Sequence, residues 1–177
     1  MPPLTGAPVS VDDMHGRNEM RNHGMERNAR RVTASLVGAV VLGCAVVSGA
    51  WAAITPDKLD GVKVVTAVEA KQLADKGAML VDTRVASESA EKTIKGAKSV
   101  VYREKSAKDV KFDRTQDKWD LSKLPSDKNA AVVTFCNGPE CWKSYKGAVL
   151  ARDAGYKQVY WLRGGLPEWI SKGLPTQ

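Results

Sequence analysis

Two cysteines in one short segment carry the most reactive chemistry of this sequence. Cys136 and Cys141 lie five positions apart in the run Phe-Cys-Asn-Gly-Pro-Glu-Cys-Trp-Lys-Ser, which ends at Ser144. A thiol becomes a nucleophile or a sulfur carrier when its pKa falls, as happens near a helix N-terminus or a cationic side chain. The segment therefore predicts thiol chemistry wherever its surroundings favour the thiolate.

The sequence offers these two thiols no imidazole as a base. Both histidines, His15 and His23, and the third cysteine, Cys44, precede residue 53. Cys-His and Ser-His nucleophile pairs are thus excluded from the remaining chain, and two cysteines without histidine make a poor zinc site. No glycine-rich phosphate loop or dinucleotide fingerprint is present. We therefore expect neither a metal nor a cofactor.

The first 52 residues have the pattern of an export signal. A polar extension, residues 1–31, ends in arginines and precedes an uncharged apolar stretch, residues 32–52, that closes on the small side chains of Ala50 and Ala52. This order is typical of a secretory signal peptide. It predicts cleavage after Ala52 and a periplasmic or secreted domain at residues 53–177.

Three other interpretations of this region remain open. The uncharged run, residues 32–54, is long enough to anchor an uncleaved chain in a membrane. The run Val-Leu-Gly-Cys that ends at Cys44 loosely resembles a lipoprotein cleavage box. Met25 would make an ordinary signal-peptide start, so the residues before it are either a mis-assigned start or a disordered tail. We expect membrane contact only through this segment.

The charge of the chain is basic, with 27 Lys and Arg against 20 Asp and Glu and a net charge of +7. Five of the basic and four of the acidic residues precede Ala53, so the predicted domain keeps a net charge of +6. An excess of this size favours anionic small molecules but is also common on solvated surfaces. We expect no nucleic-acid partner.

Residues 53–177 alternate short apolar runs with helix-like segments, which predicts an α/β fold with a small, mostly parallel sheet and helices on both faces. The first helix has a capping box, Thr66 with Glu69, and Gly77 ends it. A mixed-charge stretch, Arg103 to Asp127, is expected to be a solvated excursion or a lid. The expected strands are residues 62–65, 78–82, 99–102, 130–135 and 158–162, and the expected helices are residues 66–77, 142–154 and 167–172.

The cysteine segment follows the most apolar of these runs, so Cys136 is expected at the carboxyl end of a strand, where parallel sheets bind ligands. Gly138 and Pro139 require a tight turn, and a helix begins near Trp142. A turn that leads into a helix N-terminus leaves backbone amides free to bind one anion. Such amides would lower the pKa of the Cys136 thiol and stabilise a persulfide, with Lys143 as a nearby cation for an anionic donor.

Four motifs in order resemble the single-domain rhodaneses, a family of sulfurtransferases, and the resemblance covers residues 62–174. It implies a rhodanese-like fold and a sulfurtransferase or persulfide carrier, and the predicted signal peptide makes this an exported one. In this protein Cys136 would accept a sulfane sulfur from a small anionic donor such as thiosulfate and pass it to a thiol or a cyanide-like acceptor. The motifs are residues 80–84 (Leu-Val-Asp-Thr-Arg), residues 94–97 (Ile-Lys-Gly-Ala), the segment from Phe135 to Ser144, and residues 159–165 (Val-Tyr-Trp-Leu-Arg-Gly-Gly) with Trp169.

The same resemblance indicates which residues form the site around Cys136. Asp82 and Arg84 are expected to fix the framework of the loop by pairing with each other. The cysteine loop is longer than is usual in the family, and the family often has an arginine where this sequence has residues 141–143 (Cys-Trp-Lys). The expected cradle for the donor and the persulfide consists of Asn137, Gly138, Glu140, Cys141, Trp142, Lys143 and Ser144.

Alternatives stay open for Cys141 and for the function. Cys141 is a half-buried residue at the start of a helix, a resolving or disulfide partner of Cys136, or the working thiol itself. The protein could instead be a dithiol redox protein that uses Cys136 and Cys141, or a non-catalytic module that binds an anion or a partner. Phosphatase chemistry is disfavoured because the loop contains no arginine to bind a phosphoryl group.

Overall fold

The computed structural model describes residues 53–177, so the predicted signal segment and its cleavage site lie outside the described residues. One five-stranded sheet forms with the strand order β1-β5-β4-β2-β3, and all of its strand pairs are parallel. The strands are β1 (Lys63–Val65), β2 (Met79–Asp82), β3 (Lys98–Ser99), β4 (Ala131–Phe135) and β5 (Gln158–Leu162). The helices are α1 (Ala67–Asp75), α2 (Ala86–Glu91), α3 (Trp142–Asp153) and α4 (Gly165–Ser171), with short 3-10 turns η1 (Arg114–Gln116) and η2 (Leu121–Lys123).

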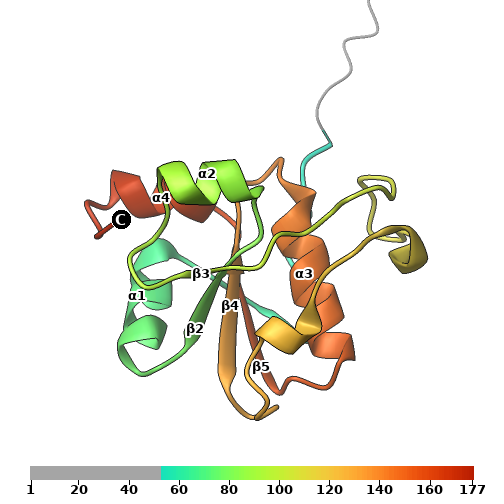
Figure 1. Cartoon of the computed structure of the whole chain (residues 1–177), viewed down its shortest axis with the longest axis horizontal. Coiled ribbons are helices and arrows are strands. Elements are labelled where there is room, and N and C mark those ends of the chain that lie inside the picture. Colours follow the sequence, from blue (N-terminus) through green and yellow to red (C-terminus); the bar gives the residue numbers. More distant parts are fainter. Residues whose placement is uncertain (1–52) are drawn as a thin grey trace, which may run out of the picture. The chain divides into compact units, whose positions relative to one another are not determined.

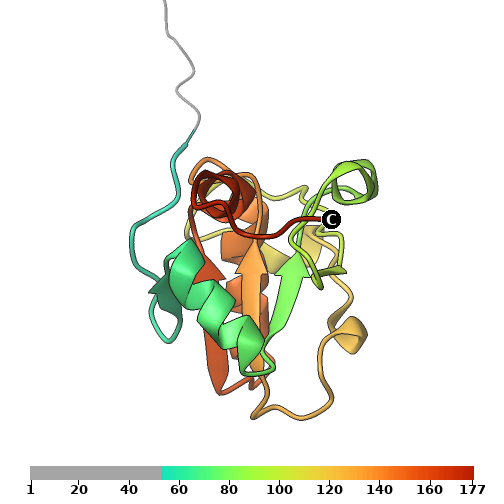
Figure 2. The ribbon, with the colours of Figure 1, turned by 90° about the vertical axis from the view of Figure 1, so that its left-hand side faces the viewer.

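The helices cover both faces of the sheet, which confirms the expected α/β architecture. α1 and α4 lie on one face and α3 on the other (Figures 1 and 2). Val133 of β4 packs with Trp169 of α4 in one core cluster, whereas its neighbour Val132 packs with Tyr145 of α3 in the other. Because β4 is buried on both faces, its sequence is a continuous apolar run rather than an alternating one.

The first helix begins and ends where local sequence signals predict. The Thr66 hydroxyl accepts a hydrogen bond from the Glu69 amide over 3.3 Å, and the Glu69 carboxylate accepts one from the Thr66 amide over 2.8 Å. Gly77 follows the last turn with φ of +94°, a conformation that glycine adopts without steric cost. These contacts satisfy donors that a helix N-terminus leaves unpaired.

Two elements differ from the expected ones. The strand expected at residues 99–102 is only the two-residue β3, which pairs with Val81 and Asp82 at the end of β2. Val100 and Tyr102 are nevertheless buried, and their amides donate to the carbonyls of Asp82 and Thr83. The unexpected helix α2 has no buried residue, so its sequence lacks the apolar periodicity that marks an amphipathic helix.

The stretch from Arg103 to Asp127 is more firmly attached than a solvated excursion. Most of its charged side chains are exposed, as expected, but Phe112 and Leu124 are buried in the same core cluster as α3. Arg103 and Lys118 also pair through their backbones. The stretch therefore forms part of the layer that covers the α3 face of the sheet.

Among residues 53–177, no helix is both long and apolar enough to cross a membrane.

Candidate active site

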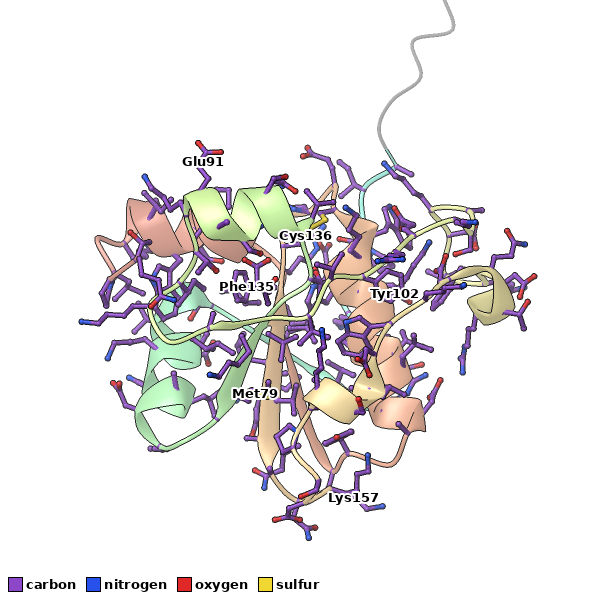
Figure 3. All side chains as sticks on the ribbon, viewed as in Figure 1. Met79, Glu91, Tyr102, Phe135, Cys136 and Lys157 are labelled. Atoms are coloured by element: carbon purple, nitrogen blue, oxygen red, sulfur yellow. A yellow bond between two sulfur atoms is a disulfide. The ribbon has the colours of Figure 1, made fainter. Side chains whose placement is uncertain are left out.

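Cys136 lies where the central strand β4 ends, at the carboxyl edge of the sheet. Figure 3 shows it at the opposite end of the sheet from Met79 and Lys157. The carbonyl of the preceding Phe135 accepts hydrogen bonds from the amide and the hydroxyl of Thr83, over 3.1 and 2.9 Å. These contacts from the neighbouring strand end fix the point at which the chain leaves the sheet, so the cysteine is held in place by the fold.

Cys136 and Cys141 form a disulfide within the loop, with their Cα atoms 6.1 Å apart. Of the three roles left open for Cys141, the structure thus places it as the partner of Cys136, while it is also half-buried and caps the N-terminus of α3. Cys136 itself is only 1% exposed. The two sulfur atoms therefore meet without displacement of any helix or strand.

The loop between the two cysteines turns tightly, as its composition predicts. Gly138 has φ of +120°, and its carbonyl accepts a hydrogen bond from the Cys141 amide over 3.0 Å. The amides of Asn137 and Glu140 donate to no backbone carbonyl within residues 53–177. The first-turn amides of α3 are also free of intrahelical partners, as in any helix. The loop therefore presents several backbone donors beside the cysteines.

Asp82 and Arg84 form a buried pair next to the loop. Arg84 donates from Nε to Asp82 Oδ1 over 3.0 Å and from Nη2 to Asp82 Oδ2 over 2.6 Å. Its other contacts reach the Lys92 carbonyl over 2.6 Å and the side-chain oxygen of Asn137 over 3.3 Å. Burial raises the pKa of Asp82, but hydrogen bonds from Arg84 and Thr93 outweigh it and lower the pKa overall. The pair is thus charged and reaches the loop through Asn137.

The start of α3 contributes backbone to the site and side chains to the core. The hydroxyl of Ser144 is buried and accepts a hydrogen bond from Trp161 Nε1 over 3.0 Å. The Trp142 ring is buried in the α3 core cluster, with its edge against Tyr145. The side chains of Trp142 and Ser144 therefore stabilise the helix start. Trp142 and Ser144 can therefore contribute to the expected donor and persulfide cradle only through their backbone amides.

A pocket of about 280 Å³ opens beside Cys141. Lys143, half-buried, lines it from α3, and the exposed Lys108 lines it from the Arg103–Asp127 stretch. Its full lining is Glu104, Lys108, Asn137, Glu140, Cys141, Trp142 and Lys143. No local sequence pattern indicates Lys108 or Glu104, because a long connection brings them to the loop. A larger hollow, of about 540 Å³, is lined by residues 100–123 and contains neither cysteine.

A fully buried lysine, which sequence patterns did not single out, holds that connection to α3. Lys146 Nζ lies 2.7 Å from Glu104 Oε1, donates to Ser106 Oγ over 2.8 Å, and lies 3.7 Å from Asp117 Oδ2. Asp117 also accepts hydrogen bonds from Ser106 and Tyr102. Lys146 therefore pairs with residues that are far away in the sequence. The one sequence signal for this buried cluster is the presence of a lysine on an otherwise apolar face of the helix.

The pKa of Asp117 is strongly affected by this environment. Burial raises it, but the hydrogen bonds from the Ser106 side chain, the Ser106 and Lys105 amides and the Tyr102 hydroxyl outweigh burial and lower the pKa to about 2. The same neighbourhood raises the pKa of Tyr102, first through burial and then through its hydrogen bond to Asp117. Asp117 is thus a carboxylate that faces the Lys146 ammonium.

The first described residues lie across the cysteine loop. Thr55 donates from its amide over 2.9 Å and from its hydroxyl over 2.7 Å, both to the carbonyl of Pro139. Trp142 Nε1 donates to the carbonyl of Ala53 over 2.6 Å. Arg163 Nη2 donates to the Thr55 carbonyl over 2.7 Å. Sequence reasoning missed this strap, residues 53–57, because it lies outside every predicted element.

The described residues were also examined for metal-binding geometry. Within residues 53–177, no group of three or more His, Cys, Asp or Glu side chains is arranged to hold a metal ion.

Comparisons with known proteins agree with the fold. The family model for the rhodanese-like domain matches residues 66–172. No curated protein matches the chain. Among solved structures, the BH2092 protein of Bacillus halodurans is similar, with a TM-score of 0.50 and 19% identity over 65% of this chain and 76% of that chain. This likeness shows a shared fold.

Two further solved structures are similar over comparable lengths. The polysulfide-sulfur transferase homodimer of Wolinella succinogenes has a TM-score of 0.49 and 20% identity, over 66% of this chain and 79% of that chain. The rhodanese-like domain of the Alr3790 protein from Anabaena has a TM-score of 0.47 and 24% identity, over 67% of this chain and 80% of that chain.

Proposed function

The chain belongs to the rhodanese-like domain family, and we propose that it is a sulfurtransferase in which Cys136 accepts a sulfane sulfur. One observation carries this proposal: Cys136 lies at the end of the central strand, next to unpaired loop amides and the N-terminus of α3. Amide dipoles and a helix N-terminus lower the pKa of a nearby thiol. They can therefore replace the histidine that residues 53–177 lack.

The proposed reaction begins with the reduced loop. A thiol reductant first opens the Cys136–Cys141 disulfide, because a sulfur atom in a disulfide is not a nucleophile. The Cys136 thiolate then attacks the outer sulfur of thiosulfate and forms a new S–S bond. The S–S bond of thiosulfate breaks, and sulfite leaves with the electron pair. The product is a persulfide on Cys136, whose negative charge the loop amides stabilise.

The donor and acceptor follow from the charges around the pocket. Lys143 and Lys108 line the 280 Å³ pocket beside Cys141 together with Glu104 and Glu140. Attraction of a small anion such as thiosulfate therefore depends on the positions of the two ammonium groups and not on an excess of positive charge in the lining. A thiol or a cyanide-like nucleophile then attacks the outer sulfur of the persulfide and releases the Cys136 thiolate. The donor molecule needs to be small, because Cys136 is almost completely buried.

The test uses a variant in which Cys141 cannot take part. Reduced Cys141→Ser protein, mixed with thiosulfate without oxygen, should release one sulfite per chain and gain the mass of one sulfur atom. Cys136→Ser protein should release no sulfite and keep its mass. If Cys136→Ser protein gains the sulfur, Cys136 is not the acceptor. If both variants fold and neither takes up sulfur from thiosulfate or polysulfide, the domain is a non-catalytic binding module.

We also propose that the domain works outside the cytoplasm, after export and cleavage behind Ala52. The uncharged run and the small residues at positions 50 and 52 support this location, as does an intramolecular disulfide, since such bonds persist mainly in oxidising compartments. N-terminal sequencing of the mature protein should begin at Ala53. A mature chain that retains residues 32–54 would instead identify this segment as a membrane anchor.

A further inference from the structure

We propose that Cys141 resolves the Cys136 persulfide, so that the transferred sulfur leaves as hydrosulfide and the loop ends as a disulfide. This inference rests on the proposed function, because it needs a persulfide on Cys136. It also names the acceptor, which is a thiol of the same loop that reacts with the persulfide before any external nucleophile does. The observation behind it is the disulfide itself, which shows that the two sulfur atoms reach each other within the intact fold.

The loop is fixed in the shape that brings the two thiols together. Thr55 holds the Pro139 carbonyl, Arg84 reaches Asn137, and the Leu166 amide donates to the Cys136 carbonyl over 2.8 Å. Each contact comes from a different part of the fold, so the loop that joins the two cysteines is held at three of its residues. A resolving thiol held in this way acts at an effective concentration of about millimolar or higher.

The position of Cys141 suits a thiol that attacks. It occupies the N-cap position of α3, a helix of 12 residues, without a side-chain capping hydrogen bond, and the positive end of a helix dipole stabilises a thiolate placed there. Cys141 is half-buried and lines the pocket that contains Lys108 and Lys143. Cys136 is buried, so an external thiol has poorer access to its inner sulfur than Cys141 has. The displaced hydrosulfide would leave into this pocket, which the ammonium groups of Lys108 and Lys143 line together with the carboxylates of Glu104 and Glu140.

The step balances without any further reactant. The Cys141 thiolate attacks Sγ of Cys136, the bond from Sγ to the outer sulfur breaks, and the outer sulfur departs with the electron pair as hydrosulfide. The two cysteines are oxidised to the disulfide, and the sulfane sulfur is reduced to sulfide. Together with the first step, one thiosulfate and two thiols give one sulfite, one hydrogen sulfide and one disulfide. Another turnover needs an external dithiol to reduce the loop.

The experiment is a single turnover of the full-length protein, reduced and then freed of reductant without oxygen. Thiosulfate is added to wild type and to Cys141→Ser, and sulfite, sulfide and intact mass are measured. The wild type should release one sulfite and one sulfide per chain and lose the mass of two hydrogens. Cys141→Ser should release one sulfite, retain one sulfur, and release no sulfide.

A second measurement separates an intramolecular acceptor from an external one. Added small thiol should restore sulfide release to the Cys141→Ser persulfide at a rate proportional to thiol concentration, whereas the wild-type rate should not depend on added thiol. A wild type that releases sulfite but keeps the sulfur as a stable persulfide would overturn this inference and leave the proposed function intact. Absence of sulfite from both proteins would refute the proposed function, and this inference with it.

Discussion

The Leu166 amide donates to the carbonyl of Cys136 over 2.8 Å, so the first turn of α4 lies directly on the cysteine loop. The residue before it makes this contact possible. Gly165 has φ of +62°, and a Cβ atom there would lie 2.2 Å from the Cys136 carbonyl oxygen and 2.7 Å from the Gly138 amide nitrogen. The glycine pair that resembles the family motif therefore has a physical role at this position: it allows two backbones to touch beside the reactive thiol.

Gly165→Ala should therefore disturb both stability and sulfur uptake. Gly173 provides a matched control, because it has a similar φ of +65° but no atom within 4 Å of its Cβ position. Gly173→Ala should cost about 1–2 kcal/mol of unfolding free energy from the left-handed backbone alone. Gly165→Ala should cost at least about 2 kcal/mol more, because backbone atoms must move, and it should slow sulfite release in the Cys141→Ser background. Equal unfolding midpoints in urea for the two variants would contradict this reading.

Lys146 is expected to be a major contributor to stability. Its side chain is fully buried, and its partners Glu104 and Asp117 are 13% and 0% exposed. Lys146→Met keeps the apolar stem but leaves two carboxylates without their cation, a change that typically costs about 3–5 kcal/mol. The exposed Lys111 provides the control, and Lys111→Met should change the unfolding free energy by less than about 0.5 kcal/mol. A loss below about 1 kcal/mol for Lys146→Met in urea unfolding would show that the cluster is not tightly coupled.

Asp117 should make stability depend on pH in acid. Its pKa is about 2 in the folded protein, below the value of 3.8 expected of an ordinary aspartate. A lowered pKa means that the unfolded chain binds the proton more tightly. The stabilisation is therefore complete above about pH 4 and is lost as the pH falls towards 2.

Asp117→Asn should consequently remove part of the acid dependence of the unfolding free energy. The variant should be less stable than wild type at pH 7, and the difference should shrink steadily between pH 4 and pH 2. Asp60 is exposed, and the control Asp60→Asn should change the unfolding free energy at pH 7 by less than about 0.5 kcal/mol. Parallel profiles for wild type and Asp117→Asn would mean that this carboxyl is not the group that titrates.

Local sequence signals predict the parts of the fold that local forces decide. The Thr66 capping box, Gly77 and the apolar run of β4 all involve residues close together in the chain, and each lies where it was expected. The alternation of strands and helices then restricts the sheet to a parallel α/β arrangement. The position of Cys136 at a strand end follows from the same pattern, because β4 ends at Phe135.

The remaining features depend on contacts between distant residues. Lys146 meets Ser106 across 40 positions, and Thr55 meets Pro139 across 84, so neither pair leaves a local pattern. The helix α2 buries no residue, so it has no apolar pattern. The charged stretch after β3 has a solvated composition, and only the structure shows that Phe112 and Leu124 are buried. The disulfide required a Cα separation that no sequence pattern specifies.

The charge of the pocket should control the rate at which the anionic donor reacts. Lys143 and Lys108 line the pocket beside Cys141, whereas Lys157 lies at the opposite end of the sheet (Figure 3). In the Cys141→Ser background, Lys143→Gln and Lys108→Gln should each lower the second-order rate constant for sulfite release from thiosulfate several-fold at low ionic strength. The difference should nearly vanish at about 1 M salt, where the Debye length is about 3 Å. Lys157→Gln should leave the rate constant unchanged, because Lys157 lies at the opposite end of the sheet from Cys136 and exposed charges that are far apart are screened by salt. If all three variants slowed the reaction equally, the effect would come from net charge, and the pocket would have no special part in donor recognition.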